Sequence, residues 1–205
     1  IFDEGLRYCE STYPYEGGIL VANFGSSQLD PLNTEGKGYI VRYKDGASEV
    51  LIPADGNLSG PRGMYLRDGH LFICDDLENR DAAPQVIALP EGEAFVNDLA
   101  AEGNNLYVSV TNTGHIYRLD ITDPAQAGEP ELWLEIAGPN GLVIRDGVMY
   151  VASYSPDGEA KSEHVIYRIA DLQNPVAEPF VNVPGQYDGI AFSGDGKWLY
   201  VTNWA

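Results

Sequence analysis

The stretch that decides the fold runs from Gly138 to Tyr154 and reads Gly-Pro-Asn-Gly-Leu-Val-Ile-Arg-Asp-Gly-Val-Met-Tyr-Val-Ala-Ser-Tyr. Two apolar runs flank Asp146-Gly147, and such a pair is a strong hairpin signal because glycine accepts the positive φ that the turn needs. We therefore expect a strand, a tight turn and a second strand at Val148–Ser153. Asn140 stands just before the first apolar run, and the residue at this position is where we expect the chemistry.

The same unit recurs along the chain, and a polar or charged residue opens each copy. The copies open at Glu10, Arg62, Asn97, Asn140 and Asp188. Their mean spacing is about 45 residues, which is the length of a four-stranded propeller blade. Turn signals at Asp68-Gly69, Gly103-Asn104 and Asp195-Gly196 separate the two apolar runs of other copies. The repeat therefore predicts an all-β chain.

Segments that suit third and fourth strands follow the hairpins. Alternating apolar and polar residues predict third strands at Tyr39–Tyr43, His115–Leu119 and His164–Ile169. Short apolar runs predict fourth strands at Val50–Ile52, Leu132–Leu134 and Pro179–Val181. The second unit has the shortest outer half, with strands expected at Gln85–Leu89 and Ala94–Val96. The expected fold is a β-propeller with about four and a half to five blades in this chain.

Residues 1–205 are expected to form one propeller domain, because no linker or change of composition marks a second one. The fifth unit stops at Trp204-Ala205, after two strands. A propeller must close its ring, since an open ring leaves two blade faces bare to water. We therefore expect the sequence to be cut short at its C-terminal end.

The composition narrows the classes of partner. The formal net charge is −19, with 12 Lys and Arg against 31 Asp and Glu. This excludes nucleic acid and anionic membrane surfaces, which need Lys and Arg, and leaves a small-molecule substrate as the expected partner. Most of the carboxylates are expected to form a solvated acidic surface. The acidic composition weakly favours a periplasmic or extracellular location. It does not indicate an oligomeric state.

Two cysteines, Cys9 and Cys74, allow one disulfide or two free thiols. Both alternatives stay open at this point, because each residue falls in a predicted strand. The cysteines therefore do not fix the redox compartment.

The opening residues of the blades are candidate ligands for a cation. In a propeller the first strand of each blade lines the central channel, so the residues that open these strands converge at one mouth. Oxygen ligands stand at four of the openings, namely Glu10, Asn97, Asn140 and Asp188. Ca²⁺ tolerates irregular six- to eight-fold oxygen coordination, and zinc prefers the His and Cys that these positions lack. We expect Ca²⁺ ahead of Mg²⁺, Mn²⁺ or Zn²⁺; the alternative is that Asn and Asp before Gly only shape turns.

These motifs resemble those of the SMP-30/gluconolactonase/LRE-like family, six-bladed propellers that are calcium-dependent lactonases. The family's Glu-Ser, Asn-Asp-Gly, Asn-Gly and Asp-Gly motifs are matched in order by Glu10-Ser11, Asn97-Asp98 with Leu99 in place of Gly, Asn140-Gly141 and Asp188-Gly189. The resemblance spans the whole chain but leaves the sixth blade unaccounted for. It implies that Glu10, Asn140 and Asp188 are metal ligands. It also implies that Asn97 is a fourth ligand or a contact through water or substrate.

The resemblance implies hydrolysis of a lactone, either a sugar lactone or a similar cyclic ester. In such an ester hydrolase the cation polarises the carbonyl, and Asp188 is the catalytic general base that takes a proton from the attacking water. The sugar-lactone members place an Arg two residues before the third-blade Asn, where this chain has Phe95. Arg62 could replace that Arg or be a plain surface cation. The substrate-binding residues that follow from the resemblance are Arg62, Phe95 and Asn97.

Two other functions stay open, because one fold hosts many functions. The chain could be a non-catalytic propeller that binds a sugar or a protein partner, with a structural Ca²⁺. It could also be a different propeller enzyme, such as a lyase, that uses the same metal.

Overall fold

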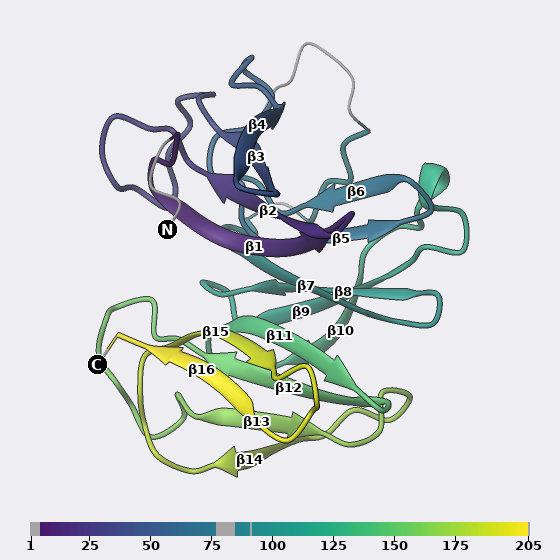
Figure 1. Ribbon diagram of the computed structural model, residues 1–205. Helices are drawn as coiled ribbons and strands as arrows, with labels where there is room; N and C mark the ends of the chain where they lie inside the picture. The colour runs from purple at the N-terminus through teal and green to yellow at the C-terminus, as the bar shows by residue number, and fades with distance from the viewer. Residues whose placement is uncertain (1–4, 77–84, 91, 205) are drawn as a thin grey trace. The chain divides into compact units, whose positions relative to one another are not determined.

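The computed structural model describes residues 5–76, 85–90 and 92–204, and within them the regular structure is β-strand apart from a 3₁₀ turn at Pro124–Gln126 (Figure 1). None of the described segments is a helix with the length and apolarity of a membrane span. The chain divides into two compact units, Ile1–Val86 and Ile87–Ala205. The single domain expected over residues 1–205 stays a prediction.

Unit 1 contains one complete sheet and one hairpin. The sheet has the strand order β1-β2-β3-β4, with bounds Cys9–Tyr15, Gly18–Asn23, Tyr39–Lys44 and Ala47–Ile52. The hairpin pairs β5 (Met64–Arg67) with β6 (His70–Ile73). Side chains of these strands meet Leu58, from the segment between β4 and β5, in a core whose other members are Leu20, Ala22, Ile40 and Met64.

Unit 2 contains two complete sheets and one hairpin. One sheet has β7, β8, β9 and β10, with bounds Val96–Glu102, Asn105–Val110, His115–Asp120 and Glu131–Glu135. The other has β11, β12, β13 and β14, with bounds Pro139–Arg145, Val148–Ser153, Ile166–Ile169 and Ala177–Val181. The hairpin pairs β15 (Tyr187–Phe192) with β16 (Leu199–Asn203).

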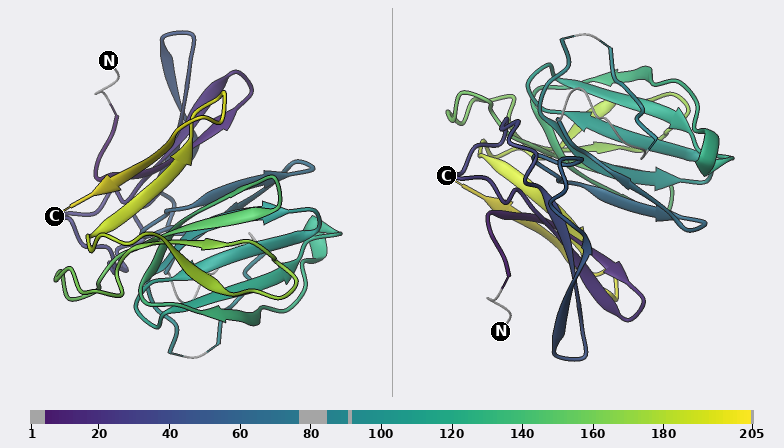
Figure 2. Two further views of the ribbon diagram at one scale, coloured as in Figure 1. Left: turned by 90° about the horizontal axis from the view of Figure 1, so that it is seen from below. Right: turned by 90° about the horizontal axis from the view of Figure 1, so that it is seen from above.

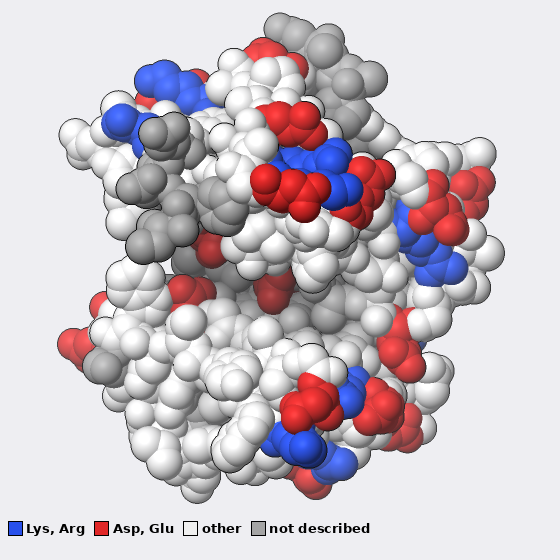
Figure 3. All heavy atoms as spheres, in the orientation of Figure 1, with Lys and Arg blue, Asp and Glu red and all other residues white. Residues whose placement is uncertain are grey.

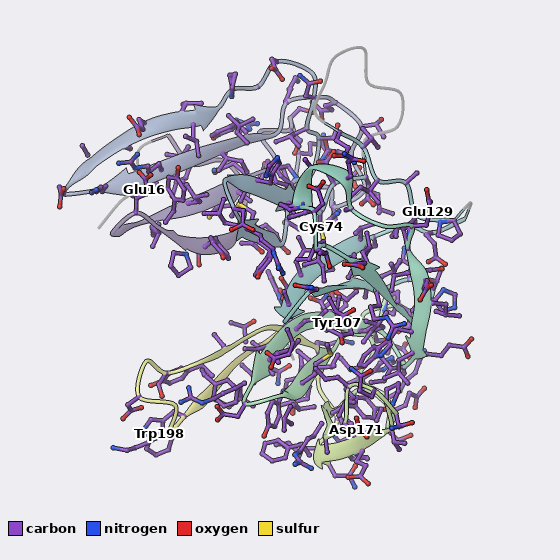
Figure 4. The ribbon with its side chains drawn as sticks, turned by 90° about the vertical axis from the view of Figure 1, so that its right-hand side faces the viewer. Glu16, Cys74, Tyr107, Glu129, Asp171 and Trp198 are labelled. Carbon is purple, nitrogen blue, oxygen red and sulfur yellow. The ribbon has the colours of Figure 1, made fainter. Side chains whose placement is uncertain are left out.

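The two complete sheets of unit 2 pack on each other through an apolar core. Its buried members include Tyr107, Ile116, Leu142, Met149 and Val151. The Tyr107 ring, labelled in Figure 4, meets the Trp133 ring edge-on at 4.6 Å between centroids. Aromatic pairs favour this geometry, which adds to the area that they bury.

The hairpin turns have the conformation that the sequence predicts. Asp146 and Gly147 have φ values of 52° and 75°, and the ladder resumes directly at Arg145 and Val148. Positive φ at both central residues is the two-residue turn whose twist matches paired strands. Figure 2 shows the tight hairpins at the ends of the sheets.

The predicted outer strands are confirmed in three sheets and wrong in the second unit. No strand forms within residues 85–90, so the strand expected at Gln85–Leu89 is absent. The strand expected at Ala94–Val96 is also absent, because Ala94 and Phe95 precede β7 and Val96 is the first residue of β7. The first segment runs directly into Pro90, which has no N–H to donate to a ladder. The predicted strand at His164–Ile169 is shorter than expected, because β13 begins at Ile166.

The charged side chains lie in mixed groups on the face shown in Figure 3. Arg42 is an example, since its Nη1 lies 3.2 Å from a carboxylate oxygen of Glu16 and 3.2 Å from one of Glu49. Both carboxylates are largely exposed, so solvent screens these pairs. The two cysteines are free thiols, Cys9 exposed and Cys74 buried.

Candidate functional site

A β-bulge interrupts the first strand of four hairpins, at the position of the candidate ligand. The ladder shifts register between Cys9 and Thr12 in β1, Val96 and Leu99 in β7, Pro139 and Leu142 in β11, and Tyr187 and Ile190 in β15. The shifts enclose Glu10, Asn97, Asn140 and Asp188. A bulge takes a residue out of the ladder and re-aims its side chain. The structure thus gives the four predicted ligands one local geometry.

The backbone two residues before three of these side chains is left-handed. Tyr8, Phe95 and Gly138 have φ values of 51°, 66° and 48°. Bulky residues rarely adopt this conformation, and where they do it often marks a functional site. Their carbonyls accept hydrogen bonds from the residue that follows the second strand, as Thr111 N does to Phe95 O at 3.1 Å. This bond holds the bent start of the strand in place.

In unit 2, the side chains of Asn97 and Asn140 are buried and not fully hydrogen-bonded. Their exposed fractions are 4% and 2%. Among the described residues, Asn140 Oδ1 and Asn97 Nδ2 have no hydrogen-bond partner. The oxygen and nitrogen of an amide can be exchanged by a flip, so Asn97 can also turn its oxygen to this position. An unpaired buried polar atom costs about 1–3 kcal/mol, and a ligand that pairs with it removes the cost.

A hydroxyl of β8 and one from the residue that follows it hold the start of β11. Ser109 Oγ donates to Asn140 O at 2.6 Å, and Thr111 Oγ1 donates to Pro139 O at 2.9 Å. Ser109 Oγ also accepts from Asp98 N at 3.0 Å. One buried hydroxyl therefore ties the bulge of β7 to the bulge of β11 and sets the positions of their two asparagines.

Asp98 makes a second link between β7 and β11. Its Oδ2 accepts from Leu142 N at 2.8 Å, and its Oδ1 accepts from Leu99 N at 2.8 Å. The protein packed around the carboxyl raises the pKa of Asp98 to about 6; the two backbone N–H groups lower it, and the nearby Asp188 carboxylate raises it. The contribution of Asp188 to this pKa is a repulsion between carboxylates of β7 and β15, the two strands that contact β11.

Asp188 is held from β16 on both sides of its own bulge. Trp204 Nε1 donates to Asp188 Oδ2 at 2.7 Å. Thr202 Oγ1 accepts from Gly189 N at 2.8 Å, the same role that Ser109 has for Asp98 N. The bulge of β15 thus has its backbone N–H satisfied by a hydroxyl of the neighbouring strand.

Gly141 lets β15 approach β11. A Cβ added to Gly141 would stand well inside van der Waals contact with Asp188 O and 3.0 Å from Ile190 N. Glycine is the residue that permits such a close approach of two backbones. Gly141 therefore brings the start of β15, with Asp188, against the residue next to Asn140.

Glu10 and Arg62 belong to unit 1. Glu10 is exposed, and its Oε2 accepts a hydrogen bond from Ser11 Oγ at 2.7 Å. Unit 2 by itself brings Asn97, Asn140 and Asp188 onto three adjacent strands, because β11 contacts both β7 and β15. The participation of Glu10 in the same site stays a prediction.

Arg62 is fully buried inside unit 1, so the interpretation as a surface cation is wrong. Its Nη1 lies 2.8 Å from Asp76 Oδ2, its Nη2 donates to Pro31 O, and its guanidinium lies 5.5 Å from the centre of the Phe24 ring. As placed, the side chain has no exposed surface. A contact with substrate stays a prediction for Arg62 and would require these partners to separate.

The donor set of unit 2 fits a hard cation. Two amides and one carboxylate lie on three strands that contact one another in the order β7, β11 and β15, and one buried amide oxygen has no partner among the described residues. Oxygen donors of this kind suit Ca²⁺. In the described part of the chain, no three or more His, Cys, Asp or Glu side chains are grouped so that they could hold a metal ion. Asn97 and Asn140 are amides and so are not members of such groups. Ca²⁺ therefore stays a proposal.

Sequence reasoning missed three contributors to this site. Ser109 and Thr202 follow equivalent Leu-Tyr-Val runs, so a hydroxyl at the same place in two repeats was the available signal. Trp204 gave no signal, because its indole reaches Asp188 only once β15 and β16 have paired. Outside the site, Glu93 gave no signal either. It accepts hydrogen bonds from Thr113, from Tyr117 Oη at 2.7 Å and from a ring nitrogen of His115 at 2.7 Å.

Comparison with solved structures identifies the fold. The chain aligns with a candidate gluconolactonase at a TM-score of 0.60 and 14% identity, over 98% of this chain and 73% of that one. The chain has a gluconolactonase-like propeller fold. The resemblance to the SMP-30/gluconolactonase/LRE-like family is thereby confirmed at the level of the fold, and the four-stranded sheets are its blades.

Two further solved structures are similar over shorter parts of their chains. A luciferin-regenerating enzyme gives a TM-score of 0.46 at 15% identity, over 95% of this chain and 53% of that one. Regucalcin of Agrobacterium tumefaciens, described as a calcium-binding protein, gives 0.39 at 19% identity, over 91% and 49%. The chain thus spans about half the length of each. No family model and no curated protein matches the chain.

Proposed function

We propose that this gluconolactonase-like chain hydrolyses a lactone at the bulged ends of β7, β11 and β15. The observation that supports the proposal most is the buried Asn140 Oδ1, which has no partner among the described residues and lies on the strand next to the one that carries Asp188. The gluconolactonase-like fold supports the class of reaction. The substrate class proposed is a sugar lactone or a similar cyclic ester.

Asn140, Asp188 and Asn97 of unit 2 would hold Ca²⁺. When bound, the cation would polarise the lactone carbonyl and stabilise the negative charge that develops on its oxygen. The alternative role of Asn97 is a contact with substrate: without a flip of the amide, its buried Nδ2 has no partner in the described chain and can donate to a substrate oxygen. Phe95, held in its left-handed conformation two residues earlier, is proposed to contact the substrate ring.

Asp188 is the proposed general base. Its carboxylate takes a proton from a water molecule as the water oxygen attacks the carbonyl carbon. The ring C–O bond then breaks, the leaving oxygen is protonated, and the product is the open hydroxy acid. Trp204 already occupies Asp188 Oδ2, so Oδ1 is the oxygen free of that indole.

The test is a pH-indicator assay on a panel of sugar and aliphatic lactones, with and without a chelator. The proposal predicts acid release that the chelator abolishes and that Ca²⁺ restores. Asp188→Asn should lower the rate by about 10²- to 10⁴-fold, the usual contribution of a positioned base. Asp195→Asn is the matched control, because Asp195 caps the distant turn of the same hairpin through Ser193 and Lys197 N.

An unchanged rate in Asp188→Asn would remove Asp188 from the reaction. Ca²⁺ binding without hydrolysis of any lactone would replace the proposal with a binding propeller that carries a structural cation.

A further inference from the structure

We propose that Trp204 is a positioning residue for Asp188 and that its indole N–H fixes the orientation in which the carboxylate meets the cation and the attacking water. This inference rests on the proposed role of Asp188. It adds a residue that neither the motifs nor the fold assigns to the site.

The backbone of Trp204 is fixed at the end of β16. The last ladder pair joins Tyr187 to Asn203, and Trp204 N then donates to Gln186 O at 3.0 Å. Gln186 N returns a bond to Asn203 Oδ1 at 2.9 Å. Trp204 is therefore anchored directly opposite the bulge that contains Asp188.

The indole reaches the carboxylate from this anchor. Trp204 Nε1 lies 2.7 Å from Asp188 Oδ2, a short distance for a bond from a neutral donor and typical of a charged acceptor. The indole nitrogen is a donor only, so it can neither take a proton from Asp188 nor bind a cation in competition with it. The bond takes one of the roughly four acceptor sites of the carboxylate and leaves the second site of Oδ2 and both sites of Oδ1 for the cation and the water.

The backbone repeat does not itself require tryptophan at this place. Phe24, Thr111 and Tyr154 follow the second strands of the other bulged hairpins, and their N–H groups make the same backbone bond. Phenylalanine, threonine and tyrosine can therefore all make this backbone bond. The ring N–H of Trp204 is thus an addition at the hairpin that carries the proposed base, and partners of this kind orient the ligands of metal sites.

The hydrogen bond is tested by NMR of the full chain labelled with ¹⁵N-tryptophan and kept free of metal. The chain has three tryptophans, so each indole N–H gives one cross-peak that a Trp→Phe variant assigns. Asp188→Ala should move the Trp204 peak and leave the Trp133 and Trp198 peaks in place. Addition of CaCl₂ to the wild type should move the Trp204 peak as well.

The positioning role is tested with Trp204→Phe, which keeps an aromatic ring and loses the N–H. We expect Ca²⁺ affinity, measured by calorimetry, to fall about 10- to 100-fold, as for other partners of metal ligands. We expect kcat to fall with little change in KM. Trp198→Phe is the control, because Trp198 is about as exposed as Trp204 (65% against 72%) and lies at the other end of the same hairpin (Figure 4).

The outcomes separate this inference from the proposed function. The inference is overturned if the Trp204 peak does not move in Asp188→Ala. It is also overturned if Trp204→Phe has the same Ca²⁺ affinity and rate as Trp198→Phe. A wild type that neither binds Ca²⁺ nor opens a lactone overturns the proposed function, and a peak that still responds to Asp188→Ala would then report a structural bond alone.

Discussion

The hairpins β5–β6 and β11–β12 have the same turn and different beginnings. Both turn on Asp-Gly, with φ values of 47° and 80° at Asp68 and Gly69, and of 52° and 75° at Asp146 and Gly147. The β5–β6 ladder runs without a shift, whereas the β11–β12 ladder is bulged at Asn140. The Asp-Gly turn therefore specifies the hairpin. The bulge is a separate feature, and it determines whether the side chain that opens the first strand is available to a ligand.

The opening residues of these hairpins have opposite environments. Arg62 N bonds to Cys74 O at 2.9 Å, and its guanidinium has an ion-pair partner in Asp76, so it closes a structural network within unit 1. Asn140 is equally buried, yet its Oδ1 has no partner in the described chain. The first residue contributes to stability, and the second keeps an oxygen available for a ligand.

The largest effect on stability is expected from Arg62→Met. Loss of the guanidinium leaves the mostly buried Asp76 without its ion pair, and breaking a buried pair costs about 3–5 kcal/mol of unfolding free energy. Urea denaturation measures this loss. Arg42→Met is the control. The carboxylates that pair with Arg42 are exposed, so these ion pairs contribute about 1 kcal/mol or less to the unfolding free energy. Equal losses in the two variants would show that Arg62 is not the structural residue described here.

A smaller effect is expected from Gly141→Ala. The added methyl forces β11 away from Asp188 O, and overpacking of this kind costs about 1–3 kcal/mol. Ca²⁺ affinity should fall as well, because Asn140 and Asp188 separate. Gly189→Ala is the matched control, since the nearest atom to its added Cβ is Thr202 Oγ1 at 3.4 Å. If both variants bind Ca²⁺ as the wild type does, the close approach of β11 and β15 has no part in the site.

The smallest effect is expected from Glu93→Gln, which loosens the segment that leads into β7. Burial raises the pKa of Glu93, but hydrogen bonds from Thr113, Tyr117 and His115 outweigh it, so the pKa is lowered overall. The carboxylate therefore stabilises the fold above its unfolded pKa of about 4.3. We expect Glu93→Gln to lose about 1 kcal/mol at pH 7.

That difference should shrink as the pH falls from about 4.3 through the lowered pKa of folded Glu93, because the unfolded carboxyl is protonated first and the folded one after it. Urea denaturation of the wild type and the variant across pH 3–7 checks this. A difference that grows towards low pH would contradict the lowered pKa.

The sequence predicted the blades and most strands because their signals are local. Asp146-Gly147 and the alternation at His115–Leu119 specify a turn and a strand within a few residues. The predicted outer strands of the second unit failed at Gln85–Leu89, where an apolar run alone did not secure a partner strand. Local pattern can specify a strand, but pairing depends on the neighbours that the fold supplies.

The site was predicted less completely, because it depends on contacts between strands. The repeat singled out Asn97, Asn140 and Asp188, and the structure places them in equivalent bulges. The links that position them, such as Ser109 to Asn140 O and Trp204 to Asp188, join residues that are 31 and 16 positions apart. The repeat can place a hydroxyl such as Ser109 at an equivalent position, but it does not name the partner that the hydroxyl or the indole reaches on another strand.

The most direct test of the central claim, that the bulged strand starts form a cation site, is calorimetric titration of the chain with CaCl₂ and comparison with Asn140→Ala. We predict one Ca²⁺ per wild-type chain and loss of most of the affinity in the variant, because the variant lacks the unpaired Oδ1. Asn105→Ala, at the far end of the β7–β8 hairpin, should bind as the wild type does. No binding by the wild type, or equal binding by Asn140→Ala, would contradict the account.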